Sequence, residues 1–237
     1  MNLVKKEQLK KDFISSISHE LRTPLTVIKG WAFTLQPEAK GNKLLEDGLS
    51  IIEKESDRLG NMVTELLDFS ELSSGRLIMN KELFDLNELG IFINKQLMPK
   101  SSSKKIDMIL NYDETKRVMV IADRDRIKQV FINILDNALK FTDEGGVVLT
   151  DIKIEDDIAV VEVIDNGCGI SEDEISLVTG KFYKGTNSNS HTGLGLSICE
   201  EIVKAHNGNL IIRSVLEKGT VVRVELPLEK GELKNEI

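Results

Sequence analysis

Cysteine, aromatic side chains and long apolar runs are all scarce in this sequence. It holds two cysteines in 237 residues, Cys168 and Cys199, and 5% of its residues are aromatic. Two cysteines cannot form a disulfide scaffold, and their spacing matches no metal-binding motif, so we expect a reducing compartment. No run of about 18 apolar residues and no signal peptide occurs. We therefore expect a cytoplasmic chain whose sequence contains no membrane span.

An excess of positive charge is also lacking. The chain has 31 basic and 39 acidic residues, a formal charge of −8. Nucleic-acid binding without sequence preference needs a basic face, so no nucleic-acid partner is expected. A nucleotide stays possible, because Mg²⁺ and a few lysines can neutralise a triphosphate. With 41% hydrophobic and 30% charged residues, the composition is that of a globular protein.

The first third of the chain predicts a helical hairpin. Apolar side chains recur in steps of three and four along residues 14–35 and again along residues 45–66, which is typical of two amphipathic helices. A break at Gln36–Asn42 separates them, and Gly75 lies just past the second. Because a lone hairpin leaves much of both apolar stripes in water, we expect two copies to form a four-helix bundle. The alternative is that the hairpin packs on its own second domain.

From about residue 80 the pattern changes to short β-rich runs separated by helical stretches. This order, with a hairpin around Asp156-Asp157, predicts an α/β sandwich with a mixed sheet. The expected strands are 83–86, 106–112, 118–121, 147–154, 158–164, 210–215 and 221–226, and the expected helices are 87–98, 123–141 and 194–207. The fold class is thus α+β and multidomain. The expected divisions are 1–75 (hairpin), 76–82 (linker), 83–228 (second domain) and 229–237 (charged tail).

His19 is predicted to lie on the first helix, away from its apolar stripe. Glu20 is adjacent, Thr23 follows one turn later on the same face, and Pro24 should bend the helix there. A neutral imidazole is a competent nucleophile near pH 7, and a neighbouring carboxylate can fix its tautomer. Taken alone, an exposed histidine is more often an indifferent surface residue.

Asn133, Asn137 and Lys140 share one face of the helix expected at 123–141, at spacings of four and three. Amide oxygens suit Mg²⁺, and an ammonium suits phosphate oxygens. The alternative is a solvated polar stripe.

Two glycine-containing segments lie in the second half. Residues 165–170, Asp-Asn-Gly-Cys-Gly-Ile, directly follow a strand, so the carboxylate of Asp165 could accept hydrogen bonds from an exocyclic amine. The alternative there is a simple turn. Residues 182–196 are rich in Ser, Asn and Gly and open into a helix, as a phosphate-binding lid would. Each signal is weak alone.

Together these motifs resemble those of bacterial sensor histidine kinases. Phe13 with Ser18–Leu25 resembles the phospho-accepting H box, and residues 61–70 with 84–86 resemble the second dimerisation helix and linker. The polar helix and the two glycine segments follow the order of the N, G1, F and G2 boxes of the ATP-binding fold. Gyrase-type ATPases, mismatch-repair ATPases and heat-shock chaperones share that fold. Glu217–Thr220 resembles its final glycine-threonine box, so the resemblance covers Phe13 to Leu228.

The resemblance implies a dimeric four-helix bundle followed by an ATP-binding domain of the gyrase, chaperone and histidine-kinase type. It implies ATP and Mg²⁺ as cofactors and His19, Glu20 and Thr23 as the catalytic group. It also implies a metal ligand, Asn137, and an adenine-reading carboxylate, Asp165. The cofactor-binding residues that it implies are Asn133, Asn137, Lys140, Phe141, Asp165, Gly167, Gly169, Ile170, Lys181, Lys184, Gly193, Leu194, Gly195, Leu196 and Thr220.

Two positions depart from the family's usual pattern. His191 stands where the family often has glycine, which alters the lid, and Thr179 stands where it often has phenylalanine, which weakens packing of the lid helix. Neither removes an expected chemical group.

The implied activity is that of an ATP-dependent protein-histidine kinase. It would phosphorylate His19 and pass the phosphoryl group to an aspartate of a response regulator. A phosphatase activity toward that regulator, with Thr23 orienting water, is a second reading, and a nucleotide-gated interaction module is a third. The expected partners are a second copy of the chain and a response regulator. The resemblance also implies a membrane-tethered full-length protein. Whether transfer occurs within or between protomers stays open.

Overall fold

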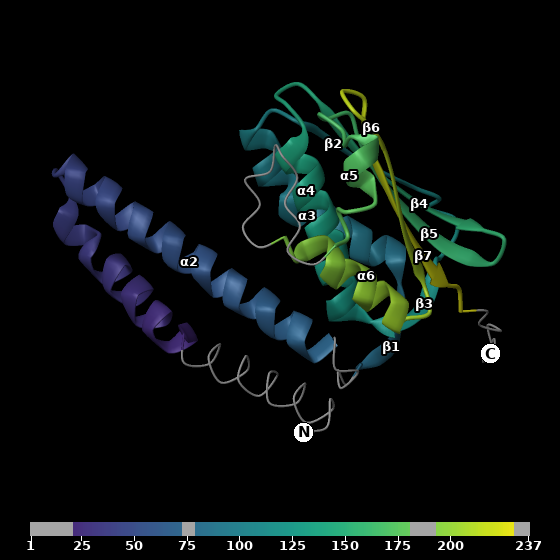
Figure 1. The fold of residues 1–237 in the computed structure, drawn as a ribbon, viewed down its shortest axis with the longest axis horizontal. Coiled ribbons are helices and arrows are strands. Elements are labelled where there is room, and N and C mark those ends of the chain that lie inside the picture. Colours follow the sequence, from purple (N-terminus) through teal and green to yellow (C-terminus); the bar gives the residue numbers. More distant parts are fainter. Residues whose placement is uncertain (1–20, 73–78, 181–192, 230–237) are drawn as a thin grey trace. The chain divides into compact units, whose positions relative to one another are not determined.

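The computed structural model describes residues 21–72, 79–180 and 193–229 (Figure 1). Its internal contacts divide the chain into two compact units. One comprises residues 1–77 with 186–194, and the other comprises residues 78–185 with 195–237. No described helix is both long and apolar enough to cross a membrane.

The first unit is a helical hairpin. Its first helix is described over residues 21–35, a short 3-10 helix η1 spans Pro37–Ala39, and helix α2 spans Lys43–Leu72. Lys29 of the first helix pairs with Asp57 of α2 at 2.6 Å. The hairpin and its break at residues 36–42 are therefore confirmed. The expected bend at Pro24 lies within a stretch that is helical throughout residues 21–35.

The second unit contains two sheets. A small sheet pairs β1 (Lys81–Asp85) with β3 (Met119–Asp123), antiparallel. The larger sheet has the order β2-β4-β5-β7-β6, in which only the β2–β4 pair is parallel. Its strands are β2 (Asp107–Tyr112), β4 (Val147–Glu155), β5 (Ile158–Asp165), β6 (Asn209–Val215) and β7 (Gly219–Pro227).

Three helices cover one face of the larger sheet: α3 (Leu86–Ser103), α4 (Arg124–Phe141) and α6 (Gly195–Ala205) (Figure 1). Helix α5 (Glu172–Ile175) is a single turn. The core forms where alternate strand residues such as Val161 and Val224 meet the apolar faces of these helices, including Ile134 and Ile202. The predicted mixed sandwich is thus confirmed.

The β4–β5 hairpin illustrates how local sequence sets the topology. Asp156 and Asp157 connect the strands, and both have positive φ, 44° and 67°. Two-residue turns with positive φ at both positions match the twist of paired strands, and Asp is among the residues that accept this conformation. The predicted hairpin is confirmed, and it directs β5 so that Asp165 is its last residue.

Candidate functional site

Helix α4 supplies a polar face over an apolar one. Its N-cap is Asp123, whose carboxylate accepts a hydrogen bond from Arg126 N at 3.1 Å. The apolar residues between the polar ones, such as Ile134 and Ala138, are buried against the sheet unit. The predicted polar residues Asn133, Asn137 and Lys140 are all partly exposed. They line one accessible face of a helix that is anchored on its other side.

Lys140 lies in a cationic environment at the last turn of α4. Burial lowers its pKa, and so do the nearby charges of Lys104 and Lys100. Its Nζ also lies 5.0 Å from the centroid of the Phe141 ring. Because neighbouring positive charges disfavour the ammonium, a bound anion would relieve that repulsion. The end of α4 is therefore suited to phosphate.

Asp165 is held in a fixed orientation at the end of β5. Its Oδ1 accepts hydrogen bonds from Gly167 N at 2.9 Å and from Thr220 N at 3.2 Å. Burial raises the pKa of this carboxyl, while the two backbone hydrogen bonds act in the opposite direction. Its second oxygen, Oδ2, makes no hydrogen bond within the described part of the chain. The fold thus presents one carboxylate oxygen as an available acceptor.

The turn after Asp165 passes too close to neighbouring backbone to carry side chains at two positions. A Cβ at Gly167 would lie 2.3 Å from the carbonyl oxygen of Phe141, and one at Gly169 would lie 2.1 Å from that of Val215. Gly169 also has a φ of +65°. Cys168 N donates to Phe141 O at 3.1 Å, so the turn is fastened to the end of α4. Glycine is required here for packing.

The beginning of α6 approaches the polar face of α4. A Cβ at Gly195, the first residue of α6, would lie 3.9 Å from Nδ2 of Asn133. Leu196 is partly exposed in the first turn of α6, and Gly193 and Leu194 immediately precede it. Hydrogen bonds and close approaches join α4, the turn after β5, the β6–β7 hairpin and the start of α6. The predicted residues on these elements are Asn133, Asn137, Lys140, Phe141, Asp165, Gly167, Gly169, Ile170, Gly195, Leu196 and Thr220.

Other predicted site residues lie elsewhere. Thr23 is exposed on the first helix of the hairpin. Thr179 is described, in the turns that follow α5. His19, Glu20, Lys181, Lys184 and His191 lie outside the described residues.

Two polar residues that were not predicted from the sequence hold the site together. Asn166 Oδ1 accepts a hydrogen bond from Val147 N at 2.7 Å, which ties the turn to the start of β4. Ser214 of β6 joins that turn to the β6–β7 hairpin through Ile170 N at 2.8 Å. A serine in an amphipathic strand gives no signal of this role. Asn166, in contrast, lies within the motif at residues 165–170.

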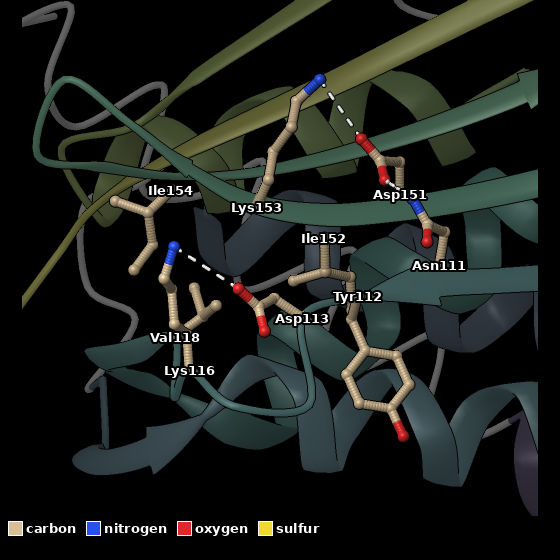
Figure 2. A pocket seen from close by; sticks show the side chains of 9 residues that line it. All are labelled: Asn111, Tyr112, Asp113, Lys116, Val118, Asp151, Ile152, Lys153 and Ile154. Carbon is tan, nitrogen blue, oxygen red and sulfur yellow. Dashed lines mark hydrogen bonds and ion pairs between the residues drawn. The ribbon is translucent and has the colours of Figure 1, made fainter.

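A separate cavity of about 320 Å³ lies along β2 and β4 (Figure 2). Its lining residues are Asn111, Tyr112, Asp113, Lys116, Val118, Asp151, Ile152, Lys153 and Ile154. Its charged groups pair with one another: Lys153 with Asp151 at 3.2 Å and Lys116 with Asp113 at 3.4 Å. None of the predicted site residues lines it, so this cavity is distinct from the candidate site.

Comparison with known proteins identifies the family. The family model described as "His Kinase A (phospho-acceptor) domain" matches residues 9–75. The one described as "Histidine kinase-, DNA gyrase B-, and HSP90-like ATPase" matches residues 122–230. The catalytic domain of histidine kinase ThkA is 32% identical, with a TM-score of 0.58, over 63% of this chain and 97% of that one. This chain belongs to the histidine kinases.

Two longer relatives are similar to this histidine kinase over most of its length. The sensor protein SrrB of Staphylococcus aureus is 32% identical over 231 residues, which cover 93% of this chain and 38% of SrrB. The crystal structure of full-length ShkA in complex with AMPPNP gives a TM-score of 0.80 at 25% identity, covering 93% of this chain and 46% of ShkA. The chain thus spans less than half the length of SrrB and of ShkA.

Proposed function

We propose that this chain is the core of an ATP-dependent protein-histidine kinase in two-component signal transduction. It phosphorylates its own His19 and passes the phosphoryl group to an aspartate of a response regulator. The observation that carries the proposal is the pairing, in one chain, of a phospho-acceptor hairpin with a site whose fixed carboxylate, cationic helix end and glycine turn suit ATP.

ATP binds in the second unit. The second carboxylate oxygen of Asp165, Oδ2, accepts a hydrogen bond from the adenine amino group, and the turn that Gly167 and Gly169 hold against the Phe141 and Val215 backbone shapes the base pocket. Asn133 and Lys140 lie beside the phosphates, with Gly193–Leu196 bordering the triphosphate and Lys181 and Lys184 contributing charge from the lid. The AMPPNP complex of ShkA supports nucleotide binding at this fold.

Mg²⁺ fits the donor set of α4. Within the described residues, no group of three or more His, Cys, Asp or Glu side chains could hold a metal ion. Mg²⁺ needs no such group when amide oxygens, water and substrate phosphates supply its ligands. The side-chain oxygen of Asn137 would be the protein ligand, and the bound ion would neutralise phosphate charge.

The reaction is an in-line phosphoryl transfer. A ring nitrogen of His19 forms a bond to the γ-phosphorus as the bond from that phosphorus to the β,γ-bridging oxygen breaks, and ADP leaves. Glu20 accepts a hydrogen bond from the other ring nitrogen and stabilises the developing positive charge. Transfer to an aspartate of the regulator follows, a step supported by the structure of ThkA in complex with the response regulator protein TrrA, 29% identical with a TM-score of 0.66.

The active form is a homodimer formed through the hairpin. Large apolar side chains of the hairpin remain in water in the single chain, among them Ile28 at 47%, Trp31 at 63% and Ile52 at 43% exposure. A second hairpin would cover the apolar stripe that includes Ile28 and Ile52.

The full-length protein is tethered to the membrane by a segment beyond this sequence and works in the cytoplasm.

Label transfer from ATP carrying a labelled γ-phosphate tests this function. We expect the unaltered protein to become labelled with Mg²⁺ present and His19→Gln to remain unlabelled, because glutamine keeps polarity but lacks a nucleophilic ring nitrogen. His206→Gln is the matched control at a buried histidine and should still be labelled. Undiminished labelling of His19→Gln would refute the assignment.

A further inference from the structure

Three polar residues lie in one row across the larger sheet beside the glycine turn. Asp165 of β5 pairs in register with Thr220 of β7, and Thr220 pairs with Ser214 of β6. Directly paired residues of antiparallel strands project to the same face. Thr220 N donates to Asp165 Oδ1, and the hydroxyls of Thr220 and Ser214 lie 2.8 Å apart. The row therefore links the base-reading carboxylate to a serine two strands away.

Ser214 makes three contacts, and these fix the direction of its proton. Its Oγ lies 2.8 Å from the carbonyl oxygen of Gly219, 2.8 Å from Ile170 N and 2.8 Å from Thr220 Oγ1. A carbonyl oxygen can only accept, so the single Ser214 proton lies between Oγ and Gly219 O. The backbone N–H of Ile170 can only donate to Ser214. The hydrogen between the two hydroxyls must then come from Thr220.

This arrangement sets what Thr220 can offer to a ligand. With its proton committed to Ser214, Thr220 Oγ1 presents only lone pairs. Asp165 Oδ2, when ionised, is also only an acceptor. These two acceptors, Thr220 Oγ1 and Asp165 Oδ2, form one wall of the base pocket. An exocyclic amine supplies hydrogen-bond donors to them, whereas a carbonyl at the same place would be a third acceptor facing two acceptors. The wall favours an aminopurine over an oxopurine.

We propose that Ser214 is a positioning residue that determines base specificity. By holding the Thr220 proton, it prevents the Thr220 hydroxyl from donating a hydrogen bond to the carbonyl of an oxopurine. This inference rests on the proposed ATP-binding function. It goes beyond that function because it assigns the selectivity for a 6-aminopurine to a residue that is not among the predicted nucleotide-binding residues. Ser214 acts only through Thr220 and through Ile170, whose N–H it anchors.

Binding of ADP and IDP tests the proposal. The two nucleotides differ at the purine 6-position, an amine against a carbonyl with its ring N–H, and neither can phosphorylate the protein. In Ser214→Ala the Thr220 hydroxyl is free to turn its proton toward the carbonyl. We expect the ratio of the IDP to the ADP dissociation constant, measured by calorimetry with Mg²⁺, to fall roughly three- to tenfold, the scale of one hydrogen bond.

Two further variants separate specificity from structure. Ser214→Thr keeps the hydroxyl and should restore the ratio of the unaltered protein. Ser101→Ala removes the hydroxyl of a buried serine away from the site, which donates to Met98 O at 3.0 Å in α3, and should leave the ratio unchanged. Thermal melting of each variant reports whether it is folded.

The outcomes distinguish this inference from the function beneath it. If the unaltered protein binds ADP and Ser214→Ala weakens ADP and IDP equally, Ser214 is only structural and the inference is overturned. A fall in the ratio that Ser214→Thr does not restore overturns it as well. If the unaltered protein binds no ADP, the proposed function itself is wrong.

Discussion

Asp165 is a partly buried carboxylate for which the described part of the chain provides no pairing cation. Burial raises its pKa above the usual value, so the folded state binds its proton more tightly than the unfolded state does. Stability from this group is present at low pH and is lost as pH rises through the raised pKa. At neutral pH the charge therefore works against folding, as expected of a group retained to bind a ligand.

Asp165→Asn separates these two effects. The amide keeps an oxygen for Gly167 N and Thr220 N but places an NH₂ group where the adenine amine must donate. We expect ADP affinity to fall roughly tenfold or more, because a hydrogen bond to a charged group is lost. The melting temperature at pH 7 should stay unchanged or rise. A variant that loses affinity only together with its melting temperature would show that Asp165 serves the fold.

His206 is another buried titratable residue, and it joins elements of the fold. Its Nε2 accepts a hydrogen bond from Asp123 N at 2.9 Å, and its Nδ1 donates to Ile202 O at 2.8 Å. The ring thereby connects the end of α6 to the start of α4. Burial lowers its pKa below the usual 6.5, as does the charge of Lys81, while the Ile202 carbonyl and Asp123 act in the opposite direction.

The pH dependence of stability follows from this lowered pKa. Below pH 6.5 the unfolded chain takes up a proton that the folded imidazole resists, so stability is full above 6.5 and declines as pH falls through the folded pKa. His206→Gln keeps an acceptor and removes the titration, so its denaturant midpoint should vary less between pH 7.5 and 5.5 than that of the unaltered protein. His206→Ala should lose about 2 kcal/mol at pH 7.5, because a buried backbone N–H loses its partner. An equal pH slope for His206→Gln and the unaltered protein would contradict this account.

Local periodicity predicted the elements well, but not how distant ones pair. The apolar steps of α4 and the Asp156-Asp157 turn are short-range signals, and both were confirmed. The strand predicted from residue 83 begins at Lys81 and pairs with β3 in a separate sheet, which no local pattern indicates. The hydrogen bond from Thr220 N to Asp165 likewise joins positions 55 residues apart.

The charged outer face of the larger sheet shows the same limit. Arg223 of β7 contacts three carboxylates, Glu155 at 2.7 Å, Glu162 at 3.1 Å and Glu225 at 2.7 Å. The hydrogen bonds from Arg223 lower the pKa of the Glu155 and Glu225 carboxyls, and the pKa of Glu162 is lowered first by a hydrogen bond from Lys153 and then by Arg223. The cluster explains why a largely antiparallel sheet with one face free of described helices carries charge there rather than apolar residues. Its members could be identified only once the register was known.

At the scale of the whole molecule, the proposed homodimer would cover the apolar stripe of the hairpin. A glutamate at position 52 would be exposed in a single hairpin and buried in a four-helix bundle, where an unpaired charge is costly. Light scattering should give twice the chain mass of 26.5 kDa for the unaltered protein and a lower value for Ile52→Glu. Leu44→Glu, at a side chain 81% exposed and outside the apolar stripe, is the matched control and should remain dimeric. A monomeric unaltered protein would contradict the dimer.

The central claim is that the terminal phosphate of ATP is transferred to His19, and locating the phosphoryl group tests it most directly. Protein incubated with ATP and Mg²⁺ would be digested without acid exposure, because a phosphorus–nitrogen bond hydrolyses in acid, and its peptides examined by mass spectrometry. We predict one acid-labile phosphoryl group on the His19 side chain. Its absence there, or a modification confined to other residues, would contradict the account.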